Sequence, residues 1–208
     1  MASRERKSPG AVGFRVKTGY AIAVLLAGPV SAPRVLQRRQ VMLCDPKGFY
    51  TRQPYHAELD LPERQAEKII ERSTKTAHAL ALDVVRTLVR ELAEAGYACR
   101  GVGLAVGSLI DPETLGSEHM RAHALEGRLY RVVLEAAAKR CRLPHLALVE
   151  RVAYKKAAEV LGRTAAQLQR AVSELGAPVG RPWRAEEKLA TLAAWVFLAG
   201  KKPRYGFR

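Results

Sequence analysis

Residues 126–158 read EGRLYRVVLEAAAKRCRLPHLALVERVAYKKAA, and this stretch decides the fold. Its first half continues an apolar pattern with the 3.6-residue period of a helix, which we expect over residues 117–141. The run LALV at 146–149 is apolar throughout, which is typical of a strand covered on both faces. A further helix is expected over 152–161. A buried strand between two helices indicates an α/β sheet protein.

Upstream, the same alternation continues. Residues 102–106 (VGLAV) predict another buried strand, preceded by a long amphipathic helix that ends near Ala95. Asp60 is expected to cap that helix, with Glu63 completing a capping box. Before it, residues 13–27 and 34–43 predict two strands, close enough in sequence to form a hairpin.

Downstream, helices are expected over residues 164–175 and 182–199, each followed by glycine. Paired strands followed by alternating strands and helices predict an α/β fold. It consists of a mixed β-sheet with an N-terminal antiparallel hairpin and helices on both faces. We expect a flexible basic arm over 1–12, a single domain over 13–200 and a basic tail over 201–208.

Composition narrows the class of protein. The 208 residues are 48% hydrophobic and 26% charged, which is a globular composition. The longest apolar run, residues 21–27, is far too short to span a bilayer and excludes an integral membrane protein. Residues 1–32 have the outline of a secretory signal, but Gly28-Pro29 and Pro33 favour a buried strand. Three cysteines without a C-x-x-C spacing argue against disulfides and favour the cytoplasm.

The charge is strongly basic and uneven. The formal net charge is +15, of which residues 1–50 carry +7 and residues 176–208 carry +5. A basic surface attracts phosphate polymers, so DNA or RNA is an expected partner. Basic ends are also common in arginine-rich proteins, and aromatic residues, at 6%, are too few to indicate a base-stacking platform.

Several segments resemble the ribonuclease-H-like superfamily, and within it the RuvC-like Holliday-junction resolvases. TGYAIAV (18–24) is similar to that family's TGYGV-type strand. Residues 126–158 are similar to its helix, Leu-Pro step, strand and following helix. RTAAQLQRAVSEL (163–175) and RAEEKLATLAAWVFL (184–198) match the placement of its last two helices. The resemblance implies a ribonuclease-H-like fold over about residues 13–199.

The resemblance also implies carboxylates that hold a Mg²⁺ pair, and most of them are missing. Where the family has an aspartate on the first strand, this chain reads Phe14-Arg15-Val16-Lys17, and Gly107 and Ser108 stand where it has a glutamate. Only Glu186 and Glu187 match the acids that begin its last helix, and acids are also favourable there through the helix dipole. Hard cations need several charged oxygen ligands, so we expect no resolvase-type nuclease activity.

A second group of polar residues keeps an enzyme with other chemistry open. His119 and His123 share one helix face with Glu126, so a divalent metal site is possible, as are solvated or hydrogen-bonded histidines. The candidate site residues of this alternative are Ser108, His119, Arg121, His123, Glu126 and Glu187.

The favoured interpretation is nucleic-acid or phosphate binding by basic residues near the hairpin and before the last helix. These residues are Arg15, Lys17, Arg38, Arg39, Arg181, Trp183 and Arg184. Trp183 is equally compatible with packing inward at the start of the last helix.

Overall fold

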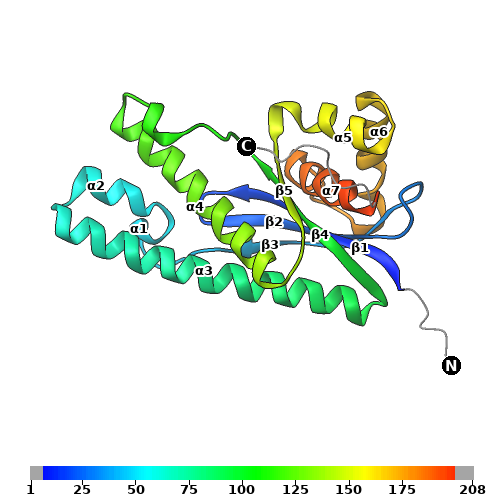
Figure 1. Ribbon diagram of the computed structural model, residues 1–208, viewed down its shortest axis with the longest axis horizontal. Helices are drawn as coiled ribbons and strands as arrows, with labels where there is room; N and C mark the ends of the chain where they lie inside the picture. The colour runs from blue at the N-terminus through cyan, green and yellow to red at the C-terminus, as the bar shows by residue number, and fades with distance from the viewer. Residues whose placement is uncertain (1–6, 200–208) are drawn as a thin grey trace.

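The computed structural model describes residues 7–199, which form a five-stranded mixed sheet with helices on both faces (Figure 1). The strand order is β3-β2-β1-β4-β5. The first three strands are antiparallel neighbours, and β4 and β5 continue the sheet parallel to β1. Their bounds are β1 Ser8–Lys17, β2 Tyr20–Ala27, β3 Arg34–Met42, β4 Tyr97–Val106 and β5 His145–Val149. The predicted fold class is confirmed.

The N-terminal part of the sheet holds one more strand than predicted. The stretch 13–27, expected as one strand, is divided by a tight turn at Thr18-Gly19 into β1 and β2. Gly19 has a φ of 82°, a left-handed conformation that glycine adopts without strain. The expected pairing of β2 with β3 is present. β1 begins at Ser8, so the segment expected as an arm contributes to the sheet from that residue, while 1–6 and the 201–208 tail lie outside the described residues.

One face of the sheet is covered by two long helices, α3 (Glu63–Glu94) and α4 (Glu118–Arg140) (Figure 1). Their buried residues pack with the inward side chains of β1, β2 and β4 in one core. The predicted start of this helix at Ser117 agrees with α4, and the side-chain oxygen of Ser117 caps the helix by accepting from the Met120 N–H. The predicted cap of α3 is wrong, because Asp60 ends a separate short helix and accepts a hydrogen bond from Tyr50.

The opposite face is covered by α7 (Ala185–Leu198), with α5 (Ala153–Leu161) and α6 (Ala165–Glu174) beyond it. α7 is buried almost all round and crosses directly over β1 and β4. Two glycines permit this approach, because a Cβ at Gly13 or Gly103 would collide with the α7 backbone at Ala190 or Ala193. α7 can therefore lie this close to the sheet only because β1 and β4 each have a glycine beneath it.

Short helical segments complete the connections between the larger elements. Those between β3 and α3 are α1 (Phe49–Arg52), η1 (Pro54–His56) and α2 (Ala57–Asp60). The others are η2 (Pro112–Thr114), η3 (Glu150–Val152) and η4 (Ala177–Val179). Within residues 7–199, no helix combines the length and hydropathy needed to cross a bilayer.

Candidate nucleic-acid interface and histidine cluster

A crevice with a volume of about 210 Å³ opens where β1 and β4 end. Parallel strands bring their C-terminal ends to one edge of a sheet, and this edge is where open α/β folds bind ligands. The walls come from the ends of both strands, the residues after β4, and one side of α4. We call this feature the edge crevice.

Four basic side chains line the edge crevice: Arg15, Lys17, Arg128 and Arg131. No aspartate or glutamate is among the described residues that line it. Ser108 adds a hydroxyl group to the same wall. Four cations thus converge on a concave surface whose described lining contains no carboxylate residue, and such a surface attracts anions.

Three of these cations are anchored by carboxylates outside the crevice. The guanidinium of Arg15 lies 2.5 Å from Glu150 and also donates to the Ala105 carbonyl oxygen. Lys17 lies 2.9 Å from Glu186, and Arg131 lies 2.9 Å from Glu135. Arg128 is exposed and has no carboxylate within 4 Å in the described part of the chain. The ion pairs hold the other three side chains in place along the edge.

The same contacts test whether this edge fits the Mg²⁺ pair that the resolvase resemblance implies. Arg15 and Lys17 occupy β1 where a carboxylate ligand is needed, and Lys17 neutralises Glu186. Glu187 is buried and accepts a hydrogen bond from the Arg184 N–H at 2.8 Å. Within residues 7–199, no three carboxylates converge as ligands. These residues do not fit a pair of hard cations.

Beside the edge crevice, three histidines converge, which we call the histidine cluster: His56, His119 and His123. One ligand nitrogen from each lies within 4.8 Å of the other two. The Nε2 atoms of His119 and His123 are 3.1 Å apart, and both side chains are exposed. The His56 ring contributes from η1, which packs against α4. His123 also lines the edge crevice, so the two features are adjacent.

Glu126 lies beneath the histidine cluster and is completely buried. Its Oε1 is 2.7 Å from Nδ1 of His56, and its Oε2 is 3.8 Å from Nδ1 of His123. Burial raises the pKa of Glu126, an effect that His56 opposes. Burial also lowers the pKa of His123, and the other two histidines add to this effect. These effects favour the neutral imidazole at His123.

The sequence placed His119, His123 and Glu126 on one helix face, and the structure brings them together. His56 was not among the candidate residues. It comes from a segment read as irregular, and no local pattern connects it with α4. Arg121 donates to the Leu115 carbonyl oxygen, and Glu187 accepts from the Arg184 N–H. Within residues 7–199, neither side chain hydrogen-bonds or ion-pairs with the histidine cluster, so the six candidate enzyme residues do not form one site.

The other predicted basic residues lie at different places. Arg38 on β3 donates to the carbonyl oxygen of Arg181, which joins the sheet edge to the segment before α7. Arg39 points to the opposite face and pairs with Glu91 of α3 at 3.0 Å. Arg38 and Arg181 are therefore brought together, whereas Arg39 is separated from them.

Trp183 is half-buried and belongs to the core under α7. Its indole N–H donates to the Val172 carbonyl oxygen at 2.7 Å, and its ring lies where a side chain at Gly176 would be. Arg184 beside it is exposed. These contacts favour the inward-packing interpretation of Trp183.

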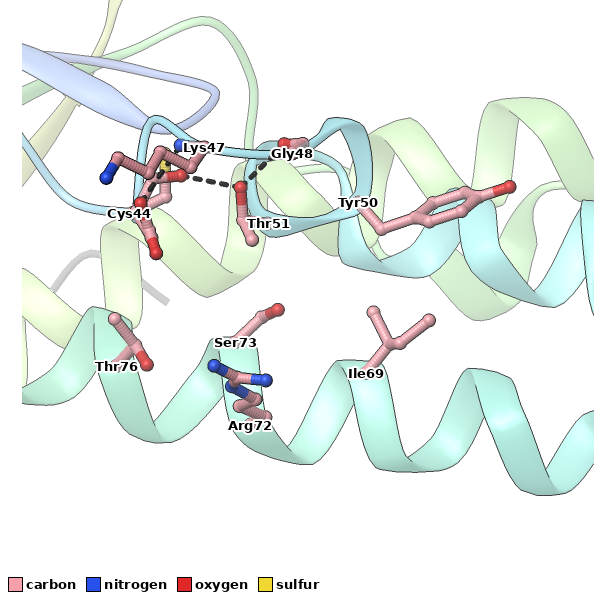
Figure 2. Close-up of a pocket in the computed structure, with 10 residues that line it drawn as sticks. Cys44, Lys47, Gly48, Tyr50, Thr51, Ile69, Arg72, Ser73 and Thr76 are labelled. Carbon is pink, nitrogen blue, oxygen red and sulfur yellow. Dashed lines mark hydrogen bonds between the residues drawn. The ribbon is translucent and has the colours of Figure 1, made fainter.

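A separate hollow of about 300 Å³ lies between the segment after β3 and α3 (Figure 2). Thr51 on its wall donates to the carbonyl oxygens of Asp45 and Gly48, and Asp45 accepts from the Lys47 N–H. These bonds close the turn after β3. Thr51 and Asp45 thus have a local structural role.

The structure is an α/β protein with a ribonuclease-H-like fold, and basic rather than acidic side chains stand at the ends of β1 and β4. Among solved structures, eleven chains match, including Thermus thermophilus RuvC, with a TM-score of 0.51 and 13% identity over 92% of this chain and 95% of that one. The T. thermophilus RuvC complex with its Holliday junction substrate has a TM-score of 0.50 and 15% identity over 92% of this chain and 95% of that one. The yeast mitochondrial Holliday junction resolvase Ydc2 has a TM-score of 0.43 and 12% identity over 95% of this chain and 80% of that one.

At these identities the similarity shows the fold alone. No protein-family model and no curated protein sequence matches the chain.

Proposed function

We propose that this protein binds the phosphate backbone of DNA or RNA at the edge crevice and does not cleave it by a two-metal mechanism. The observation that carries this proposal is the set of four basic side chains in a crevice whose described lining has no carboxylate. Phosphate contacts supply most of the affinity of a protein for nucleic acid and require converging cations of this kind.

The absence of cleavage is inferred from the side chains at the edge of the sheet where β1 and β4 end. A two-metal mechanism stabilises the attacking and leaving oxygens with a pair of ions about 4 Å apart. Arg15 and Lys17 would repel such ions. Their ion pairs also occupy the carboxylates of Glu150 and Glu186, which are then not free to bind a metal. In this proposal, the phosphates lie against the cations of the edge crevice with no metal ion between them.

Two further observations support binding of a long polyanion rather than a single phosphate group. The junction of Arg38 with Arg181 gives a second basic site on the α7 side of the sheet. A protein with the same fold, T. thermophilus RuvC, was solved with a Holliday junction substrate, which is a polyanion.

The three cysteines are free, in accord with action in the reducing cytoplasm.

The test is fluorescence anisotropy with a four-way DNA junction, a DNA duplex and an RNA hairpin, titrated at several salt concentrations. With about four phosphate contacts, the affinity for DNA should fall by about a hundredfold between about 50 and 200 mM KCl. No binding to any of the three at low salt would overturn the proposal.

Charge reversal localises the binding surface. Arg128→Glu should weaken binding by about fivefold or more and make the salt dependence shallower. Arg86→Glu is the matched control, because Arg86 is exposed on α3 and does not line the edge crevice. Equal losses in both variants would contradict the assignment of the crevice.

A cleavage assay tests the second part of the proposal. Incubation of the labelled junction with the protein and Mg²⁺ or Mn²⁺ should leave the DNA uncut. Cleavage that persists through purification of the protein and is lost in the Lys17→Ala variant would contradict the proposed absence of a two-metal mechanism.

A further inference from the structure

We propose that His56, His119 and His123 bind one Zn²⁺ ion, with Glu126 as the residue that positions the His56 imidazole. This site is independent of phosphate binding and uses none of the basic residues of the edge crevice. Three features support it: the positions of the ring nitrogens, the hydrogen bond of Glu126 with His56, and the buried Oε2 of Glu126, which has no hydrogen-bond partner.

The spacing of the histidines is that of ligands to one small cation. Zinc binds imidazole nitrogen at 2.0–2.1 Å, which places two nitrogens of a tetrahedral site about 3.3 Å apart. The Nε2 atoms of His119 and His123 are 3.1 Å apart, one helical turn from each other on α4. His56 closes the group from η1, with all three ligand atoms within 4.8 Å.

Glu126 fixes which nitrogen His56 presents. Its Oε1 lies 2.7 Å from Nδ1 of His56, so Nε2 is the nitrogen left for a ligand in that ring, whereas Nδ1 of His123 is 3.8 Å from Oε2, too far for a hydrogen bond. A carboxylate on the far nitrogen of a metal-bound histidine is the usual orienting contact in zinc sites, where it also makes the imidazole a better donor.

The alternative, three histidines joined only by hydrogen bonds, leaves one feature unexplained. Oε2 of Glu126 is buried and makes no hydrogen bond, in a side chain that is completely buried. A buried polar atom without a hydrogen-bond partner is costly. A divalent cation held by the rings above Glu126 would offset part of this cost.

The donor set selects the class of metal. Neutral imidazoles suit Zn²⁺ and its first-row neighbours, whereas Mg²⁺ and Ca²⁺ require oxygen ligands. Three protein ligands leave a fourth position open, as in zinc sites that hold a water molecule. His119 and His123 are exposed, and His123 lines the edge crevice, so the open position faces solvent beside the phosphate-binding wall.

The test uses tag-free, metal-stripped protein, titrated with Zn²⁺ by calorimetry and with Co²⁺ by visible absorption. We expect one ion per chain and the absorption bands of tetrahedral Co²⁺, displaced by Zn²⁺. His119→Ala and His123→Ala should each weaken Zn²⁺ binding by at least tenfold. Both residues are exposed, so these variants should fold. Glu126→Gln should weaken binding by about ten- to a hundredfold.

His78→Ala is the matched control, because His78 is exposed on α3 outside the cluster, and it should bind Zn²⁺ as the parent does. Binding that is absent in the parent chain, or equal in the parent and both cluster variants, would overturn the proposal. Arg128→Glu separates this proposal from the preceding one, since that variant should bind nucleic acid about fivefold more weakly or worse and bind Zn²⁺ as the parent does.

Discussion

Arg15 of β1 and Glu150 at the end of β5 form an ion pair across the intervening strand β4, with 2.5 Å between Nη2 and Oε2. The guanidinium is almost entirely buried, whereas the carboxylate is 45% exposed. The two partners therefore depend on each other unequally. Glu150 can be hydrated without Arg15, but Arg15 loses most of its charge compensation without Glu150.

This inequality predicts different costs for the two single substitutions. Glu150→Ala should reduce the free energy of unfolding by about 1–3 kcal/mol, because it leaves a buried cation without its carboxylate. Arg15→Met, which keeps an apolar stem and removes the charge, should cost less than about 1 kcal/mol. Urea denaturation of both variants measures the difference, and a larger loss in Arg15→Met would show that packing rather than charge controls this corner.

Gly13→Ala should be among the most destabilising single substitutions in the chain. The added methyl group would collide with the Ala190 carbonyl oxygen, so α7 would have to move away from β1. We expect a loss of about 3 kcal/mol or more, the upper end of what overpacking costs. Gly107→Ala is the control, since a methyl group there meets nothing within 4 Å, and its thermal midpoint should be nearly unchanged. Similar midpoints for the two variants would contradict the close packing of α7.

Burial raises the pKa of the Cys99 thiol to about 11, which predicts slow alkylation and a pH-dependent stability. At pH 8 only about a thousandth of this thiol is ionised, so iodoacetamide should label it far more slowly than in urea-unfolded protein. Because the pKa is raised on folding, its contribution to stability is complete below about pH 8.5 and is lost as the pH rises towards 11. Mass spectrometry of labelled peptides from pH 8 to pH 10 should show a tenfold rise per pH unit. A rate at pH 8 equal to that of the unfolded chain would contradict this assignment.

Local signals explain which parts of the fold could be predicted. Ser117 and Thr164 stand at the predicted starts of their helices, where the structure shows each side chain capping the helix, and Gly162 ends α5 in a left-handed conformation. These boundaries were predictable because capping acts within one helical turn. The β1–β2 turn was missed because Thr18-Gly19 lies between two apolar runs that together resemble one strand.

The same distinction between local and tertiary signals applies to the residues of the candidate sites. His119, His123 and Glu126 could be grouped from their spacing alone, since three- and four-residue intervals share a helix face. His56 reaches them only because η1 packs on α4, a tertiary contact with no local sequence signal. The ion pairs of Arg15 and Lys17 likewise join distant parts of the chain and depend on the sheet order.

Trp183 decides whether the segment before α7 binds nucleic acid by stacking or only by charge. Its indole N–H donates to Val172, and its ring covers Gly176, so most of the ring is already in contact with protein. Trp183→Phe should remove one hydrogen bond, lower the free energy of unfolding by about 1 kcal/mol, and leave the affinity for DNA within about twofold. Arg181→Ala, which removes an exposed cation from the same segment, should weaken DNA binding by severalfold without a comparable loss of stability. A stacked base contributes about 1–3 kcal/mol, so a tenfold loss of affinity in Trp183→Phe with unchanged stability would instead place this indole against a base.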